Sequence, residues 1–303
     1  CTRGRALPPT AVPDTQAFLL SHFGLPIDSG IAPITGLADG INTTHGYWLR
    51  MDPVHLHLNR DQLILLDSQS FNIDPDEADQ LVSTINQHFQ DGGIRILAPS
   101  SKRWYAHFDT EQNLVFHPKN RIIGQPVNLH LPSGEMGTHW KSILNDIQML
   151  LFAHPVNEAR ETRGEMAINS IWPWALGQLP AIHEQPWKRI LSQNPLAAGL
   201  VQLSGGEHIM LPPNAGAWLN EIQNGDMLIL DKSLPDGYSS GEPEWKEAIT
   251  ALETNWFIPL LEALKSSRLD RIHLHLPAEN RVLHLEIQQS DLWKFWRHHL
   301  HLL

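Results

Sequence analysis

Between residues 45 and 117 the chain alternates apolar and polar side chains with a period of two, and this pattern constrains the fold more than any other feature. Such alternation is typical of strands with one buried face. Strands are expected at residues 47–58 (interrupted by Pro53), 63–66, 94–97 and 103–108. A helix is expected before the third strand, because Asp74 can cap it, Pro75 fits its first turn and Glu77 completes a capping box. Two strands, a helix and two strands predict a compact α+β module.

The last third of the chain has a different pattern, typical of α/β proteins. The apolar run of residues 226–231 predicts a strand buried in a parallel sheet, and residues 199–203 predict a further short strand. Residues 244–265 carry an apolar stripe of helical period, in which Pro259 is expected to cause a kink. Two further runs alternate cleanly and predict a hairpin-like pair of strands, at residues 271–276 and 281–287.

Charge and composition exclude several classes of protein. The net charge is −11 with histidine neutral, and no Lys/Arg block is present, so binding to a nucleic-acid backbone is not expected. No apolar run reaches the ~18 residues of a membrane span, so no membrane association is expected. The single cysteine, Cys1, permits no internal disulfide and fits a reducing compartment, so a cytoplasmic location is expected.

The stretch from His154 to Pro180 combines amide, guanidinium and indole side chains. Amides and guanidinium groups orient anionic ligands, and tryptophan can wall a pocket. The other interpretation is that the tryptophans anchor the core and the asparagines cap turns, which composition alone favours. His55 and His57 share one face of their expected strand, but with no carboxylate partner in view they are more simply half-exposed strand residues than metal ligands.

The order of these motifs resembles a known family, the archaeal-type cofactor-independent (2,3-bisphosphoglycerate-independent) phosphoglycerate mutases of the alkaline phosphatase superfamily. It resembles most closely the bacterial set labelled RpfE-type regulatory proteins. The likeness extends over about three quarters of the chain, and its most specific part is Asn169-Ser-Ile-Trp172. The other matching segments are Trp48 to Asp52, Asp67 to Ala78, Arg103 to His107, Ile123 to Pro126, Leu131 to Gly134, and His154 to Arg160.

The resemblance implies a fold and a division into domains. The fold would be α/β, an alkaline-phosphatase-like three-layer α/β/α sandwich with an inserted α+β domain. Residues 1–40 and 120–303 would form the α/β core, whose N-terminal strand is expected to precede Cys1, and residues 41–119 would form the inserted cap. The α+β module expected from the alternation falls where this insert would lie.

The resemblance also implies a substrate side, retained here as Arg50, His107, Asn157, Arg160, Asn169 and Trp172. These residues would line a cleft that holds a phosphate or carboxylate, since an arginine binds an anion most strongly where water is excluded. In the alternative interpretation, Arg50 and Arg160 pair with acidic residues across a domain interface, because buried arginines are usually paired.

The catalytic side departs from the family pattern. The mutases use two divalent metals, each held by Asp or His, and a serine nucleophile. The Asp-Glu-Ala-Gly-His motif corresponds to Asp236-Gly-Tyr-Ser-Ser240, which keeps the Asp and replaces the His. The Asp-His motif expected after Leu276 is replaced by Pro277-Ala-Glu-Asn280. Thr15 is the only candidate nucleophile, and Asp236 the only retained metal-ligand candidate in these motifs.

Three hypotheses follow. The first is a catalytically degenerate relative with no bound metal, which acts by binding a phosphate- or carboxylate-bearing small molecule. The second is an active isomerase or phosphotransferase of the mutase type, with two Mn, Zn or Mg ions held by replacement ligands; the candidates are Asp231, Asp236, His273, His275 and His284. The third is a regulatory protein that binds a protein partner through residues 244–264 and the Trp-rich C-terminus.

Overall fold

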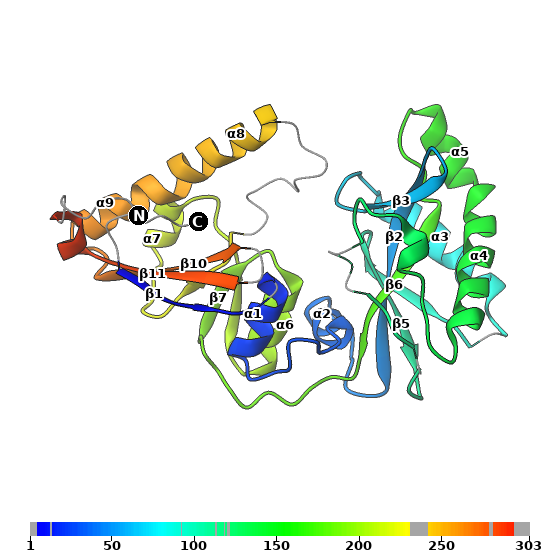
Figure 1. Ribbon diagram of the computed structural model, residues 1–303, viewed down its shortest axis with the longest axis horizontal. Coiled ribbons are helices and arrows are strands. Elements are labelled where there is room, and N and C mark those ends of the chain that lie inside the picture. The colour runs from blue at the N-terminus through cyan, green and yellow to red at the C-terminus, as the bar shows by residue number, and fades with distance from the viewer. Residues whose placement is uncertain are drawn as a thin grey trace. The chain divides into compact units, whose positions relative to one another are not determined.

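A computed structural model describes residues 5–12, 14–91, 93–112, 114–117, 119, 122–230, 242–278 and 281–293. The chain divides into two compact units, one of residues 29–181 and one of residues 1–28 with 182–303. Figure 1 labels their helices and strands where there is room. Both units mix helices with strands, so the expected α/β class is confirmed at this level, whereas the three-layer sandwich stays a prediction.

The unit of residues 29–181 is built on a five-stranded antiparallel sheet. The strands follow the order β3-β2-β5-β4, and β6 also pairs with β2. The strands are β2 (Tyr47–Asn59), β3 (Gln62–Asp67), β4 (Ile96–Ser100), β5 (Arg103–Phe108) and β6 (Ser170–Gly177). The helices are α2 (Ala32–Ala38), α3 (Pro75–His88), α4 (Gly137–Phe152) and α5 (Pro155–Thr162), with a 3-10 turn η2 (Val127–Leu129).

Strand β2 is the centre of this sheet and changes partners along its length. Its first residues, 47–50, pair with β5, and its last residues, 54–59, pair with β3. Strand β6 runs along the other side of β2, from Trp48 to Val54. Pro53 lies where β5 has ended and β3 has not begun. A proline cannot donate a ladder hydrogen bond, and it is tolerated here because neither β5 nor β3 pairs with this residue. The expected interruption at Pro53 is therefore an exchange of partners within one continuous strand.

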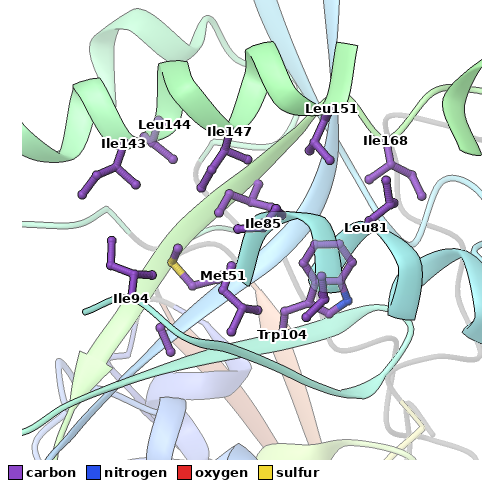
Figure 2. Close-up of a cluster of buried hydrophobic side chains, with 14 of the residues drawn as sticks. Met51, Leu81, Ile85, Ile94, Trp104, Ile143, Leu144, Ile147, Leu151 and Ile168 are labelled. Atoms are coloured by element: carbon purple, nitrogen blue, oxygen red, sulfur yellow. The ribbon is translucent and has the colours of Figure 1, made fainter. Parts of the chain in front are cut away.

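Helices α3 and α4 cover one face of the sheet and form the core of this unit with it. The buried residues of α3 and α4 recur at helical spacing, as amphipathic helices require. Figure 2 shows Ile143, Ile147 and Leu151 pointing from α4 toward Ile85 of α3 and Met51 of β2. The start of α3 agrees with the sequence, because the Glu77 carboxylate accepts a hydrogen bond from the Asp74 amide at 3.2 Å, as in a capping box.

The described strands of the second unit form two three-stranded sheets. One is parallel, in the order β8-β7-β9, and the other is antiparallel, in the order β1-β11-β10. The strands are β1 (Arg5–Thr10), β7 (Arg189–Ser192), β8 (Glu207–Met210), β9 (Met227–Leu228), β10 (Arg271–Ala278) and β11 (Arg281–Gln288). The helices are α1 (Thr15–His22), α6 (Pro195–Leu203), α7 (Ala215–Leu219), α8 (Glu242–Leu252) and α9 (Ile258–Lys265), with a 3-10 turn η5 (Gln289–Trp293).

Several sequence-based expectations for this unit can be compared with the structure. The hairpin-like pair is confirmed as β10 and β11, and β9 is a parallel strand, although much shorter than residues 226–231. The long helix is interrupted by a π-helical turn, η4 (Glu253–Phe257), which ends just before Pro259. The strand expected at residues 199–203 is wrong, because these residues belong to α6, whose N-cap Asn194 accepts from the Leu196 amide at 2.9 Å.

The compact unit of residues 29–181 is larger than the insert expected over residues 41–119. Strand β6 pairs with β2, and α4 packs on the same sheet, so residues 120–181 join this unit. Helix α2 adds residues from the N-terminal side, where its Thr35 bonds to Arg50 of β2. The family-type boundaries therefore stay a prediction, and the units of the structure are used below.

We expect the alanine variant of Ile147 to lower the free energy of unfolding by about 2–5 kcal/mol, because Ile147 is fully buried in the α3–α4 core. Met149 lies on the same helix and is 70% exposed, so Met149→Ala is the matched control, with an expected change within about 0.5 kcal/mol. Urea unfolding followed by circular dichroism measures both. Equal losses in the two variants would contradict this assignment of the core.

Candidate functional site

Strand β2 separates apolar residues from charged ones onto its two faces. Leu49 and Met51 enter the core beneath α3 and α4. Arg50 and Asp52 face the other side, because successive side chains of a strand alternate. Both are buried, with 4% and 0% of their surface exposed, and Arg50 also donates to the Thr35 hydroxyl of α2 at 3.3 Å. The sheet therefore buries charged groups on the face opposite to α3 and α4.

Five side chains on this face form what we call the buried charge network: Arg50, Asp52, Asp67, Lys119 and Trp174. Arg50 donates through Nε and Nη2 to the two carboxylate oxygens of Asp52, each at 2.8 Å. The Lys119 ammonium lies 3.0 Å from Asp52 Oδ2 and 2.8 Å from Asp67 Oδ2. The Trp174 indole donates to Asp52 Oδ2 at 3.0 Å. Two cations thus face two carboxylates, and the network is formally neutral.

Aromatic rings enclose the two cations. The Arg50 guanidinium carbon lies 5.0 Å from the centre of the Tyr105 ring and 5.1 Å from that of Trp174. The Lys119 ammonium lies 5.2 Å from the Trp174 ring. Ring faces attract cations at this range, more strongly where water is excluded. Ala175 has a φ of 60° at an irregularity in the β2–β6 pairing, so backbone strain is stored beside Trp174.

The protonation of Asp52 depends on its cationic neighbours. Burial alone would raise the pKa of this carboxyl group, but the charges of Arg50 and Lys119 and their hydrogen bonds outweigh burial and lower it. Burial would lower the pKa of Lys119, and the charges of Asp52 and Asp67 raise it instead. Both groups are therefore ionised at neutral pH, and each stabilises the charged form of the other.

A second ion pair lies close to this network. Arg103 donates through Nε and Nη2 to the two oxygens of Asp39, at 2.7 and 2.6 Å, and the Tyr105 hydroxyl donates to Asp39 at 2.7 Å. Burial raises the pKa of Tyr105 above its ordinary value, with Asp39 adding to the effect and Arg50 opposing it. Tyr105 is thus a neutral donor that links the two groups of charges.

Three of the predicted substrate-binding residues share this face of the sheet: Arg50, His107 and Trp172. Arg50 pairs in register with Tyr105, and Asp52 pairs with Trp172. Residues opposite each other in an antiparallel pair point to the same face. The structure therefore brings these three residues onto one face of the sheet. That this face binds an anion stays a prediction.

The His107 ring fits beside β2 because residue 46 is a glycine. Its ring lies 4.9 Å from that of Trp48, its register partner on β2. Gly46 has a φ of 70°, and a Cβ atom at that residue would lie 2.3 Å from His107 Nε2. Any larger residue at position 46 would therefore strain the backbone and collide with the imidazole.

Arg160 lies apart from the buried charge network, on α5. Its Nη1 donates to Glu77 of α3 at 2.5 Å, and its Nε and Nη2 donate to the carbonyls of Met166 and Asn72 at 2.7 and 2.8 Å. The side chain is 2% exposed. Arg50 and Arg160 are thus both paired with acidic residues, as the alternative interpretation expected, although both pairs lie within one unit.

The two predicted asparagines bond to the backbone. Asn157 donates to the carbonyls of Leu151 and Ile168, at 2.8 and 2.9 Å, and accepts from the Ile168 amide at 2.7 Å. Asn169 accepts from the Leu56 amide at 2.7 Å and donates to its carbonyl at 3.0 Å. Both side-chain amides therefore hydrogen-bond to backbone groups and join separate segments of this unit. Their role in binding a substrate stays a prediction.

The predicted catalytic residues belong to the other unit. Thr15 is the first residue of α1, next to the N-cap Asp14, whose carboxylate accepts from the Ala17 amide at 2.8 Å. Thr15 as a nucleophile stays a prediction. Asp236, the predicted metal-ligand candidate, lies outside the described residues, as do Asp231, Ser240, Glu279 and Asn280.

The described residues do not fit a two-metal centre. Within them, no group of three or more His, Cys, Asp or Glu side chains is arranged to hold a metal ion. Of the replacement ligands, His273 lies on β10 with His275, and His275 is hydrogen-bonded to His284 of β11.

Among the residues that the structure describes, no helix is long and apolar enough to cross a lipid bilayer.

Sequence reasoning missed Asp52, Asp67 and Lys119 as members of the site. Asp52 shares a face of β2 with Arg50, which was a usable signal, whereas Asp67 lies on the neighbouring strand β3, opposite Val54. Lys119 is 67 positions from Asp52 and belongs to none of the strands or helices expected from the sequence, so no periodicity could place it.

We expect Lys119→Met to destabilise the protein by about 3–5 kcal/mol, because it leaves two buried carboxylates with one cation. A carboxyl group with a lowered pKa stabilises the fold above its unfolded pKa, and this stability is lost as the pH falls through the folded pKa. The variant raises the pKa of Asp52, so its acid unfolding should begin at a higher pH.

Chemical and acid unfolding of Lys119→Met measure these two effects. Lys141→Met is the control, since Lys141 is an exposed residue of α4 and its loss should change stability by less than about 0.5 kcal/mol. If the two variants unfold at the same denaturant concentration and the same pH, Lys119 does not stabilise the network.

Comparison with known proteins identifies the family. A family model for 2,3-bisphosphoglycerate-independent phosphoglycerate mutase matches residues 5–157. The chain is 26% identical over 246 residues to the enzyme of that name from Methanothrix thermoacetophila, which covers 75% of this chain and 62% of the relative. It is 27% identical over 168 residues to the 2,3-bisphosphoglycerate-independent phosphoglycerate mutase 2 of Methanothermobacter thermautotrophicus, over 52% of this chain and 41% of the relative.

The chain therefore spans less than two thirds of the length of these relatives. Among solved structures, the PH0037 protein from Pyrococcus horikoshii has a TM-score of 0.56 at 14% identity, over 95% of this chain and 78% of that one, which shows a shared fold alone. The family match takes in half of the chain, including four residues of the buried charge network, Arg50, Asp52, Asp67 and Lys119. On this basis, the chain belongs to the family of 2,3-bisphosphoglycerate-independent phosphoglycerate mutases.

Proposed function

We propose that this chain is a catalytically degenerate phosphoglycerate-mutase-like protein that acts by binding a phosphate- or carboxylate-bearing small molecule. The observation that carries the proposal is the fork-like pairing of Arg50 with Asp52. The mutase motif that resembles this segment has Asn at the position of Asp52. An aspartate there supplies the negative charge that a substrate would otherwise bring to Arg50, so the ligand site is weakened.

The remaining cation of the network supports the same conclusion. Lys119 bonds to both Asp52 and Asp67, so the charges of Arg50 and Lys119 are both already neutralised by carboxylates of the network. An anionic ligand would have to replace Asp52 at Arg50, and a bidentate carboxylate is a strong competitor. Weak binding, adequate for sensing an abundant metabolite, is therefore expected in place of tight substrate binding.

The sequence of the metal-binding motifs also favours lost catalysis. Ser240 stands at the position of one family histidine, and Pro277-Ala-Glu-Asn280 stands in place of the Asp-His motif. A hydroxyl or amide is a poor substitute for imidazole in holding Mn²⁺ or Zn²⁺. The proposal includes the alkaline-phosphatase-like sandwich for the α/β core, a likeness to RpfE-type regulatory proteins, a cytoplasmic location, and no binding to nucleic acid or membrane.

The competing proposal is an active cofactor-independent mutase, or another metal-dependent phosphomutase or phosphatase. The names of the relatives favour it, and so do the retained Arg50, Asn157 and Arg160. Asp236 would then be a metal ligand, two divalent ions would supply the charge that activates the attacking oxygen, and Arg50 would orient the phosphate. A regulatory role through a protein partner is compatible with the first proposal, and co-purification of such a partner would support it.

Binding of 3-phosphoglycerate by calorimetry tests the first proposal, with the wild type compared with Asp52→Asn. We expect weak binding to the wild type and at least about tenfold tighter binding to the variant, because the change frees the Arg50 guanidinium for the ligand. Asp67→Asn is the matched control, since it removes a carboxylate that contacts Lys119 but not Arg50 in the described contacts. Ligand-induced thermal shifts confirm that the variants are folded.

The same preparations decide between the two proposals. We expect no two-site Mn²⁺ binding and no conversion of 3-phosphoglycerate with Mn²⁺ present. Turnover, or tight binding of two Mn²⁺ per chain, would establish the active mutase instead. If neither the wild type nor Asp52→Asn binds 3-phosphoglycerate or inorganic phosphate, the proposed anion pocket is wrong.

A further inference from the structure

Imidazole groups gather on one face of the antiparallel sheet β1-β11-β10, in the unit of residues 1–28 and 182–303. His275 of β10 and His284 of β11 are register partners, so their side chains point to the same face. His22 of α1 packs over the same face, with its ring centre 6.3 Å from that of His275. None of these residues belongs to the buried charge network, and the proposed function uses none of them.

The two paired histidines face each other through equivalent atoms. His275 Nδ1 lies 2.8 Å from His284 Nδ1, and the other nitrogen of His284, Nε2, lies 2.8 Å from the hydroxyl of Thr10 on β1. Two facing ring nitrogens can share only one proton, so one nitrogen donates and the other presents a lone pair. The Thr10 hydroxyl can accept the Nε2 proton of His284, and this tautomer leaves the His284 Nδ1 lone pair directed at His275.

We propose that His275 and His284 chelate one divalent ion of the Zn²⁺, Ni²⁺ or Cu²⁺ class through their Nδ1 atoms, in place of the shared proton. His275 and His284 were considered above as replacement ligands of a two-metal centre; the site proposed here binds a single ion, and the inference does not rest on the proposed function.

The separation of the two nitrogens fits such a chelate. A Zn²⁺ ion bound 2.0–2.1 Å from each nitrogen would hold them about 2.9 Å apart at a right angle, and somewhat farther apart in a tetrahedral site. The observed 2.8 Å is close to this span, and both rings must turn so that their lone pairs converge on the ion and no longer on each other. His275 and His284 are half-buried, so water can fill the other coordination positions.

The protonation state also favours metal binding. Burial, together with the neighbouring imidazoles of His284, His22 and His273, lowers the pKa of His275 to about 4. Burial and His22 lower the pKa of His284 as well. Both rings are therefore neutral at pH 7, and a metal ion need not displace an added proton, as it must at an ordinary histidine below its pKa.

Other polar and aromatic side chains surround the two rings. His22 uses its Nδ1 to bond to the Phe18 carbonyl at 2.9 Å, and its ring stacks on Trp187. Glu286 lies next along the same face of β11, where it pairs with Arg271 at 3.2 Å, and its contact with His273 is 3.8 Å long. Thr10 holds the Nε2 side of His284, as hydroxyl or carbonyl partners do for metal-bound imidazoles.

Calorimetric titration of the full chain with Zn²⁺ or Ni²⁺ tests the proposal. We expect one equivalent that is lost in His275→Ala and in His284→Ala, and weakened about tenfold in Thr10→Val, which keeps both ligands but removes the hydroxyl bonded to His284 Nε2. Mn²⁺ should bind far more weakly, following the order of affinities of nitrogen ligands, so this test is separate from the mutase test.

Two control variants exclude other histidines. His57→Ala removes an exposed histidine whose ring lies 6.1 Å from that of His55, a pair with no facing nitrogens among the described contacts. A triple Ser variant of His298, His299 and His301 removes the histidines near the end of the chain. If either control loses the Zn²⁺ equivalent, or if folded His275→Ala and His284→Ala retain it, the proposal is wrong. Histidine nitrogen NMR gives a second readout, because only His275 and His284 should shift on addition of Zn²⁺.

Discussion

The carboxylate of Asp52 is the group on which the unit of residues 29–181 depends most. It is fully buried, and it accepts hydrogen bonds from Arg50, Lys119 and Trp174. A buried carboxylate is tolerated only when cations and donors replace the water it has lost, so these partners are fixed in place together. Because they come from β2, β6 and the segment that holds Lys119, one charge ties three parts of the chain to the same sheet face.

This arrangement links stability to function. In an enzyme, an arginine on such a face is more useful when its charge awaits the substrate, because the interaction then stabilises the bound state alone. Here Asp52 occupies the guanidinium continuously and makes the site rigid and neutral. Stability gained inside the folded protein is affinity withheld from a ligand, and this is the physical reason behind the proposal that the chain binds its ligand weakly.

The sequence predicted elements well where hydrophobic period and capping residues agreed. Helix α3 was recoverable from Asp74 and Glu77, and the pair β10–β11 from alternation alone. Residues 199–203 were misassigned because a short apolar run fits a strand or a buried helix equally, although Asn194-Pro195 was a helix-start signal. The site was harder: motifs found Arg50, but its neutralisation by Asp52 and Lys119 depends on contacts between distant segments, which no local pattern encodes.

Pro53 has a consequence beyond the geometry of β2. Between Arg50 and Val54 the strand is paired with β6 on one side, while on the other β5 has ended and β3 has not started, as far as the described strand pairings go. Such a gap leaves backbone groups that another polypeptide could recognise and extend into an intermolecular sheet. Proline has no amide proton, so it interrupts that template. It therefore disfavours aggregation at the middle of β2, the strand that pairs with β3, β5 and β6.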